Sequence, residues 1–173
     1  MTLIELVVTI AIAAILITIA IPSYQYVTTT NRIASEINGL IGDLQFARAE
    51  AIKEGNEVTV CVSSDGMSCD TGSTTWSEGW IVFSDVNSNQ TVASSGDILR
   101  VQKPFASFGS GDTFTSNGQD GVSAITYNRE GFTAGLAGTA MITMIDPTMN
   151  ATYTRCLTVS TVGLTTTLST GCT

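Results

Sequence analysis

An uninterrupted apolar stretch near the start of the chain constrains the possible folds more than any other sequence feature. No charged residue lies between Leu6 and Ile21, and the next charge after Glu5 is Arg32. A bilayer-spanning helix needs about 20 mostly apolar residues, so this stretch is long enough to cross a membrane. It has neither the basic n-region nor the cleavage site of a signal peptide. We therefore expect the mature chain to keep it.

Glu5 lies between this stretch and the apolar residues Leu3 and Ile4, with no basic side chain near it in the sequence. A charged side chain at the centre of a membrane helix costs about 2.5–3.5 kcal/mol on insertion scales. Glu5 is therefore a candidate functional residue that needs a cationic partner. In the isolated subunit, its carboxylate has the alternative of extending toward the lipid headgroups.

The apolar stretch is expected to continue into an amphipathic helix. Beyond Arg32, apolar residues recur at steps of three and four, which is typical of one helix face. They are Ile33, Ile37, Leu40, Leu44, Ala47 and Ala51. Gly55 suits a C-cap. We predict one helix from Thr2 to Glu54, about 80 Å long. Pro22 removes one backbone hydrogen bond, at a cost of about 3 kcal/mol, and marks a weak point.

Short strand patterns separated by polar loops follow Gly55 and predict a β-rich region. The predicted strands are Val58–Val62, Trp80–Phe83, Ile98–Val101, Ala124–Tyr127, Ala140–Ile145, Tyr153–Val159 and Leu164–Leu168. The expected fold class is α+β, with the long N-terminal helix packed on an antiparallel β-sheet domain. We divide the chain into a hydrophobic segment (1–31) and a globular domain (32–173). The globular domain comprises the amphipathic helix (32–54) and the β-rich part (56–173).

The composition argues against enzymes and nucleic-acid-binding proteins. The chain has 15 acidic and 7 basic side chains, a formal net charge of −8, and no histidine. This charge repels phosphates, and the basic residues are scattered along the chain. Without histidine, the commonest general base and metal ligand is absent. We expect neither catalytic activity nor a cofactor.

Four cysteines, Cys61, Cys69, Cys156 and Cys172, suggest two disulfides in an oxidising compartment. Three pairings are possible, and the simplest joins neighbours: Cys61 to Cys69 and Cys156 to Cys172. Each such bridge is worth roughly 2.5–3 kcal/mol in the loop-entropy model. A zinc site is the alternative, but C-x-x-C spacing and histidine are both absent.

Asp85, Asn87 and Asn89 have the D-x-N-x-N spacing of a calcium loop. However, Gln90 stands where an EF-hand loop has glycine, and Gly96 stands where it has the bidentate glutamate. We therefore favour an ordinary polar hairpin loop and keep calcium as a weaker alternative.

The N-terminal stretch TLIELVVTIAIAAILITIAIP resembles the start of type IV pilins and type II secretion pseudopilins. Met1 occupies the position of the N-methylated residue of that family, which is often phenylalanine. Four further segments resemble the GspH/FimT-type pilin domain and occur in the same order. They are DLQFARAEAIKEGNEVTVCVSSDG, WSEGWIVFSD, DILR and ITYNREGF.

The resemblance implies a role and a set of partners. It implies a helical homo-oligomeric filament in which Glu5 faces the methylated N-terminal amine of a neighbouring subunit. At 4 Å and an effective dielectric of 20, such a pair gains about 4 kcal/mol before desolvation. The resemblance further implies an inner-membrane subunit that is processed by a prepilin peptidase/methylase. The assembly machinery would then incorporate it into an extracellular pilus.

We expect a structural subunit of a type IV pilus, and two alternatives remain. One is a minor pseudopilin of a type II secretion system, and the other is a pilus-tip pilin that binds DNA or a surface. Some FimT-type pilins bind DNA through a G-R-x-R motif. The matching position here is Gly163-Leu164-Thr165-Thr166, which has no arginine, so DNA binding is disfavoured. We also expect that part of residues 14–21 is helical in the membrane and non-helical in the filament.

Overall fold

The computed structural model describes residues 2–105, 112–116, 121–169 and 172. Its dominant element is the helix α1 (Leu3–Glu54), which runs unbroken for 52 residues. Thr2 is its N-cap, and Gly55, in the left-handed conformation at φ 71°, is its C-cap. By length and composition, α1 contains one segment apolar enough to cross a membrane. The predicted C-terminal boundary, Glu54, is confirmed, and the helix begins one residue after the predicted Thr2.

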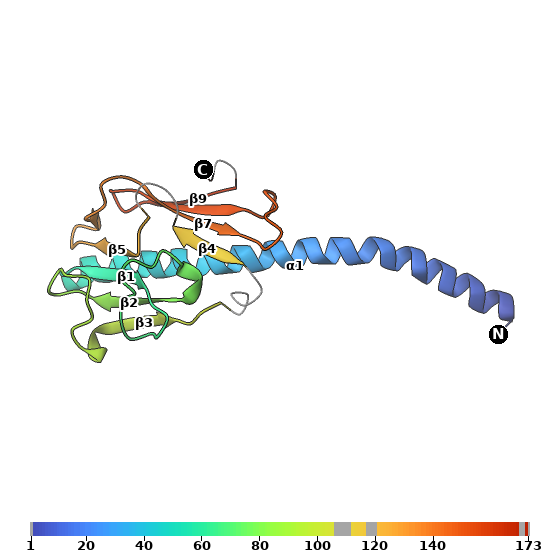
Figure 1. The fold of residues 1–173 in the computed structure, drawn as a ribbon, viewed down its shortest axis with the longest axis horizontal. Coiled ribbons are helices and arrows are strands. Elements are labelled where there is room, and N and C mark those ends of the chain that lie inside the picture. The colour runs from blue at the N-terminus through green and yellow to red at the C-terminus, as the bar shows by residue number, and fades with distance from the viewer. Residues whose placement is uncertain (1, 106–111, 117–120, 170–171, 173) are drawn as a thin grey trace.

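The two halves of α1 lie in different surroundings. The N-terminal half projects away from the rest of the molecule, whereas the C-terminal half lies along the β-sheets (Figure 1). The predicted stripe, from Ile33 to Ala51, is buried at every position. It belongs to one hydrophobic core together with residues of both sheets. The 3.6-residue periodicity therefore identified the packed face of the helix.

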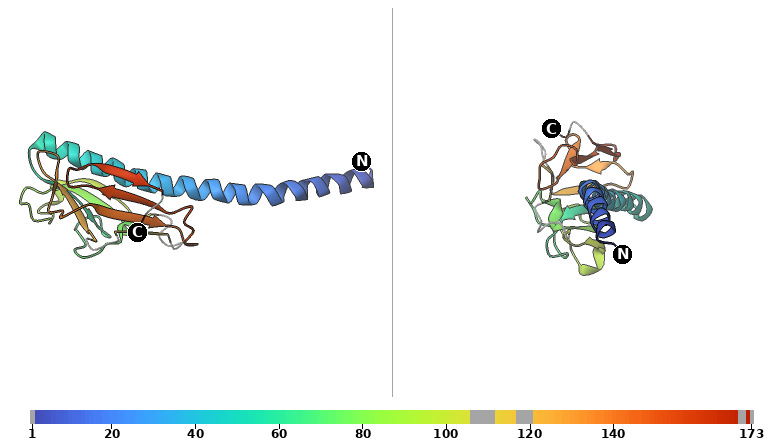
Figure 2. Two further views of the ribbon diagram at one scale, coloured as in Figure 1. Left: turned by 90° about the horizontal axis from the view of Figure 1, so that it is seen from above. Right: turned by 90° about the vertical axis from the view of Figure 1, so that its right-hand side faces the viewer.

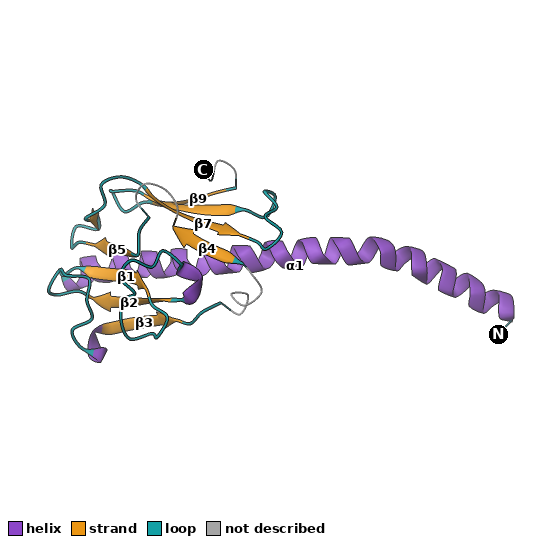
Figure 3. Ribbon diagram, in the orientation of Figure 1, coloured by secondary structure: helices purple, strands orange, loops and turns teal. Residues whose placement is uncertain are grey.

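The β-strands form two antiparallel sheets, seen as separate groups of arrows in Figure 3. The first sheet has the order β3-β2-β1-β5-β6, and the second has the order β4-β7-β8-β9. The first comprises β1 (Val58–Val62), β2 (Trp80–Ser84), β3 (Ile98–Gln102), β5 (Ala124–Tyr127) and β6 (Thr133–Ala134). The second comprises β4 (Thr113–Ser116), β7 (Ala140–Ile145), β8 (Arg155–Val159) and β9 (Thr165–Leu168). Two short 3₁₀ helices, η1 (Trp76–Glu78) and η2 (Ser95–Asp97), lie in the connections.

The α+β class is confirmed, but the sequence did not indicate two sheets or the strands β4 and β6. Both strands are short, and β4 reads TFTS, which has no apolar run. Their pairing with β7 and β5, respectively, makes them strands. Strand β8 begins at Arg155 rather than Tyr153, because the Tyr153 amide donates to the Asn150 carbonyl in a turn.

Aromatic side chains fill the core beneath α1. Trp76 and Trp80 are fully buried, with ring centroids 6.4 Å apart. Phe105 lies between Trp80 and Phe114, with centroid distances of 5.5 and 5.9 Å. This chain of rings runs from the first sheet to β4 of the second, and α1 lies along one face of both sheets (Figure 2).

Both disulfides join neighbouring cysteines in the structure. Cys61 pairs with Cys69, and Cys156 pairs with Cys172, with Cα–Cα distances of 5.6 and 5.7 Å. The first bridge fixes the loop after β1, and the second ties the C-terminal tail to β8. We predict that peptide mapping under non-reducing conditions recovers these two pairs. A peptide joining Cys61 to Cys156 or Cys172 would contradict this pairing.

Candidate assembly surface and pockets of the globular domain

Glu5 takes part in a capping box at the start of α1. The backbone N–H of Thr2 donates to the Glu5 carboxylate at 3.3 Å, and the Glu5 N–H donates to the Thr2 hydroxyl at 3.4 Å. The T-x-x-E spacing is the sequence signature of this motif, which our sequence analysis missed. Met1, the expected amine partner, lies outside the described residues. Pairing between Glu5 and the Met1 amine thus remains a prediction.

The N-terminal half of α1 presents a large apolar surface. Apart from Pro22, whose side chain is not described, residues 3–28 are all exposed. Leu3 is 84% exposed and Ile19 is 67% exposed, which leaves most of their apolar area uncovered. Monomeric soluble proteins rarely expose contiguous apolar patches larger than a few hundred Å². This surface therefore requires lipid or another protein chain around it.

Pro22 does not interrupt the helix in the isolated chain. The α-helix is continuous through residue 22, although the projecting half curves, as Figures 1 and 2 show. Because proline has no N–H, the Thr18 carbonyl has no i+4 amide to accept from. The Thr18 hydroxyl donates to the Ile15 carbonyl one turn earlier. A non-helical span in the filament remains a prediction.

Two contacts attach α1 to the second sheet where the helix leaves the globular domain. The Arg32 guanidinium lies 2.8 Å from the carboxylate of Asp112, which is buried next to β4. The Tyr26 ring lies 5.7 Å from that of Tyr153, in the loop between β7 and β8. Together they set the direction in which the exposed half of the helix projects.

A third attachment joins α1 to the edge strand β3. Asp43 accepts from the Trp80 indole N–H and from the Arg100 guanidinium, both at 2.9 Å. The Arg100 guanidinium also lies 3.7 Å from the centre of the Phe46 ring, a cation–π arrangement. One helix carboxylate therefore satisfies a buried indole and holds β3 against the helix.

The calcium candidate forms a polar loop in which the side-chain oxygens of Asp85 and Asn89 already have partners. The buried Asp85 carboxylate accepts from the backbone N–H groups of Asn89 and Gln90 and from the Thr59 hydroxyl. The Asn89 side-chain oxygen accepts from Thr91 instead. These contacts fit the favoured hairpin-loop interpretation. Among the described residues, no group of three His, Cys, Asp or Glu side chains suits a metal ion.

The turn between β8 and β9 is held against α1 by Arg48. Its guanidinium donates to the carbonyls of Val162 and Gly163, each at 3.2 Å. Gly163 adopts φ +75°, and a Cβ there would lie 2.3 Å from the Gly131 carbonyl. Glycine is thus required where this turn, the β5–β6 connection and the helix meet. This is also the place where the DNA-binding motif was expected by resemblance.

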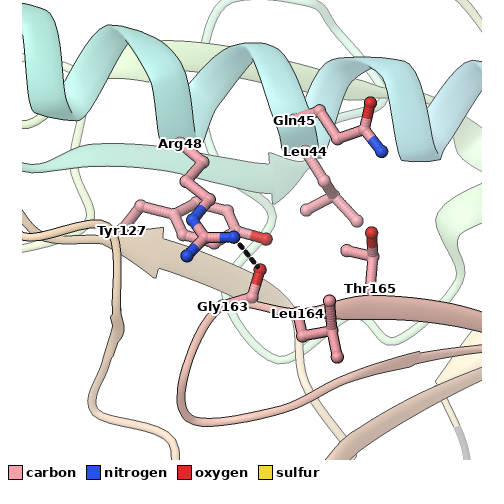
Figure 4. A pocket seen from close by; sticks show the side chains of 7 residues that line it. All are labelled: Leu44, Gln45, Arg48, Tyr127, Gly163, Leu164 and Thr165. Atoms are coloured by element: carbon pink, nitrogen blue, oxygen red, sulfur yellow. Dashed lines mark hydrogen bonds between the residues drawn. The ribbon is translucent and has the colours of Figure 1, made fainter.

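A pocket of about 250 Å³ opens beside this turn. Its lining comes from α1, β5 and the start of β9 (Figure 4). The residues that line it, besides Gly163, are Leu44, Gln45, Arg48, Tyr127, Leu164 and Thr165. The Tyr127 side chain is buried, and this burial raises its pKa to about 12, although Arg48 acts in the opposite direction. The hydroxyl is therefore a neutral hydrogen-bond donor at physiological pH.

The sequence placed Leu44 on the buried stripe, and the family resemblance pointed to Gly163, Leu164 and Thr165, but neither predicted a pocket. Arg48 and Gly163 are separated by 115 positions, and no spacing pattern connects such distant residues. The one available signal was Arg48 itself, a basic residue beside the buried stripe of a helix that was expected to pack on a sheet. That signal predicts a polar contact at the edge of the interface but does not identify the contact's partner.

Comparisons with known proteins agree with this architecture. The family model described as Type II transport protein GspH matches residues 36–163. No curated protein matches the chain. The crystal structure of the type IV minor pilin FimU of Pseudomonas aeruginosa (strain PAO1) in space group P21 aligns with a TM-score of 0.61 and 18% identity. The alignment covers 79% of this chain and 87% of that one. The P65 form gives a TM-score of 0.58 at 18% identity, covering 78% and 91%.

Proposed function

Because this chain belongs to the GspH family, whose members are pilins and pseudopilins, we propose that it is a structural subunit of a type IV pilus filament. The subunit is held in the inner membrane by the N-terminal half of α1 before assembly. It then enters a helical homo-oligomer, in which the same surface packs against other subunits. The prepilin peptidase/methylase and the pilus assembly machinery are its processing and assembly partners.

The exposed apolar half of α1 is the observation that carries this proposal. A surface that is apolar on all sides suits two environments, lipid and the centre of a helix bundle. The acidic Glu5 near its tip suits the second environment when a cation of another subunit is next to it. In this proposal that cation is the N-terminal amine of Met1 of a neighbouring copy.

A minor pseudopilin of a type II secretion system is the second candidate, and the description of the matching family model favours it. The similarity to FimU, itself a minor pilin, supports a third candidate, a minor subunit at the pilus tip. The three roles differ in abundance and in location. A main pilus subunit is the dominant protein of filaments outside the cell, whereas a pseudopilin is not found there.

Sheared extracellular filaments from the native organism provide the test. Electron microscopy should show filaments, and mass spectrometry should identify this chain as their main component. If filaments are present and this chain is a trace component, it is a minor subunit. If the chain is found only in the cell envelope, the pseudopilin role replaces the proposal.

We further propose that residues 32–173 fold independently of residues 1–31. The buried core begins at Ile33, and the attachments at Arg32, Asp43 and Arg48 all lie within the second unit. A fragment that begins at residue 30 is expected to be soluble and to show cooperative thermal unfolding with both disulfides formed. An unfolded fragment with intact disulfides would contradict this division.

Pro22→Ala is expected to impair filament assembly or extensibility. In lipid, the backbone groups of residues 6–21, apart from the Thr18 carbonyl that faces Pro22, must be hydrogen-bonded within the helix, because lipid offers no partner. Inside a filament this constraint is weaker, and β-branched residues before Pro22 tolerate an extended backbone. Extension adds length, since an extended residue spans about 3.3 Å and a helical residue about 1.5 Å. Alanine at position 22 restores the missing N–H and makes extension less favourable.

Hydrogen exchange of residues 14–21 is the measurement for this prediction. We expect faster exchange in native filaments than in the subunit in detergent, and a smaller difference in the Pro22→Ala protein. A filament map with α1 unbroken from Leu3 to Glu54 would contradict the extended span.

A further inference from the structure

The pocket beside the β8–β9 turn combines a cation and a buried donor with no acidic group in its lining. Among the described residues, Arg48 has no carboxylate within salt-bridge distance, whereas Arg32, Lys53, Arg100 and Arg129 each have one. Its guanidinium donates to two carbonyls, which leaves further N–H donors of its five unused. Among the described residues, Arg155 is likewise partly buried and donates only to backbone carbonyls, so the missing carboxylate alone does not distinguish Arg48.

Tyr127 supplies the second observation. Its side chain is buried, and among the described residues its hydroxyl has no hydrogen-bond partner. Figure 4 shows the hydroxyl pointing into the space between Leu44 and Thr165. A buried hydroxyl without a partner costs about 1–3 kcal/mol, and a ligand that accepts its hydrogen bond recovers this cost.

We propose that this pocket binds a carboxylate group, with one oxygen accepting from the Tyr127 hydroxyl and the other from Arg48. The Gln45 amide and the Thr165 hydroxyl, which also line the pocket, provide further donors. Leu44 and Leu164 form an apolar wall for the carbon atoms that carry the carboxylate.

The size and charge of the pocket define this ligand class. At about 250 Å³, the pocket is smaller than the about 300–1,000 Å³ typical of drug-sized ligands. It therefore suits a small organic acid or a single Asp or Glu side chain. One guanidinium balances one carboxylate. A phosphate dianion or a nucleic acid keeps further negative charge that Arg48 does not balance, and the net charge of −8 repels that charge more strongly than it repels a single carboxylate.

Acetate, the simplest organic carboxylate, is the probe for carboxylate binding. It is added to the ¹⁵N-labelled full chain in nonionic detergent. NMR signals of the Arg48 side-chain N–H and the Gln45 amide should shift and saturate in the millimolar range. Sodium chloride at matched ionic strength should not shift them. Tyr127→Phe keeps the ring and should weaken acetate binding about tenfold, equivalent to about 1.4 kcal/mol. Tyr153→Phe, which removes a hydroxyl outside the pocket, should bind acetate normally.

The carboxylate comes either from an acidic side chain of a second copy or from a free small acid. Varying the protein concentration distinguishes these two sources. If a second copy supplies an acidic side chain, the same signals shift as the chain is concentrated without acetate, and acetate reverses the shift. If a free acid is the ligand, the signals are independent of protein concentration. Failure of acetate to saturate, equal binding by Tyr127→Phe, or tighter binding of inorganic phosphate would overturn the proposal. None of these outcomes depends on whether the chain is a pilin or a pseudopilin.

Discussion

Replacing Glu5 with alanine is expected to abolish filament assembly and to leave the globular domain folded. In the proposed filament, the change leaves the N-terminal amine of a neighbouring subunit buried without a partner. Removing one member of a buried ion pair costs about 3–5 kcal/mol. Each 1.4 kcal/mol is a tenfold change in an equilibrium constant, so each subunit addition becomes at least about a hundredfold less favourable. The measurement is the amount of filament recovered per cell.

Because Glu5 belongs to a capping box, two further variants are needed to separate its charge from its capping role. Glu5 also accepts the Thr2 N–H in the isolated subunit, so Glu5→Ala removes a cap as well as a charge. Glu5→Gln keeps a hydrogen-bond acceptor and removes the charge, whereas Thr2→Ala removes the capping hydroxyl and keeps the carboxylate. If the charge is needed for pairing, Glu5→Gln prevents assembly and Thr2→Ala permits it. The reverse result would assign the role of Glu5 to capping, and normal filaments from Glu5→Ala would refute the pairing.

Leu40→Asp is expected to unfold the globular domain. Leu40 is fully buried in the core that α1 forms with both sheets. Removing a buried leucine costs about 2–5 kcal/mol, and a buried carboxylate without a partner adds to this cost. The sum approaches the whole stability of a domain, about 5–15 kcal/mol. Near-UV circular dichroism reports the loss, because Trp76 and Trp80 are rigidly held in the same core.

Ala49→Asp is the matched control for this prediction. Ala49 lies on the same helix and is exposed, so the substitution adds the same charge without burying it. We expect a native near-UV spectrum for Ala49→Asp and a flat one for Leu40→Asp. A native spectrum from Leu40→Asp would show that the helix does not depend on this contact with the sheets.

Some of the long-range structure left no trace in the sequence. Asp43 joins Trp80 and Arg100 to the helix, although these partners lie 37 and 57 positions away in the chain. The strand β4 has no apolar run, and it becomes a strand because β7 pairs with it. In each case the decisive partner lies far away in the chain, and residue patterns report only neighbours.

The sequence by itself determined the long helix, its apolar and amphipathic halves, its caps and most strands. These features follow from periodicity and from Thr2 and Gly55, which act within a few residues of their own positions. Only the tertiary structure decided that the strands divide into two sheets and that Arg48 meets Gly163 beside Tyr127. The physical reason is that sheet order and pocket lining depend on which distant segments bury their apolar faces together, and one local pattern is compatible with several such arrangements.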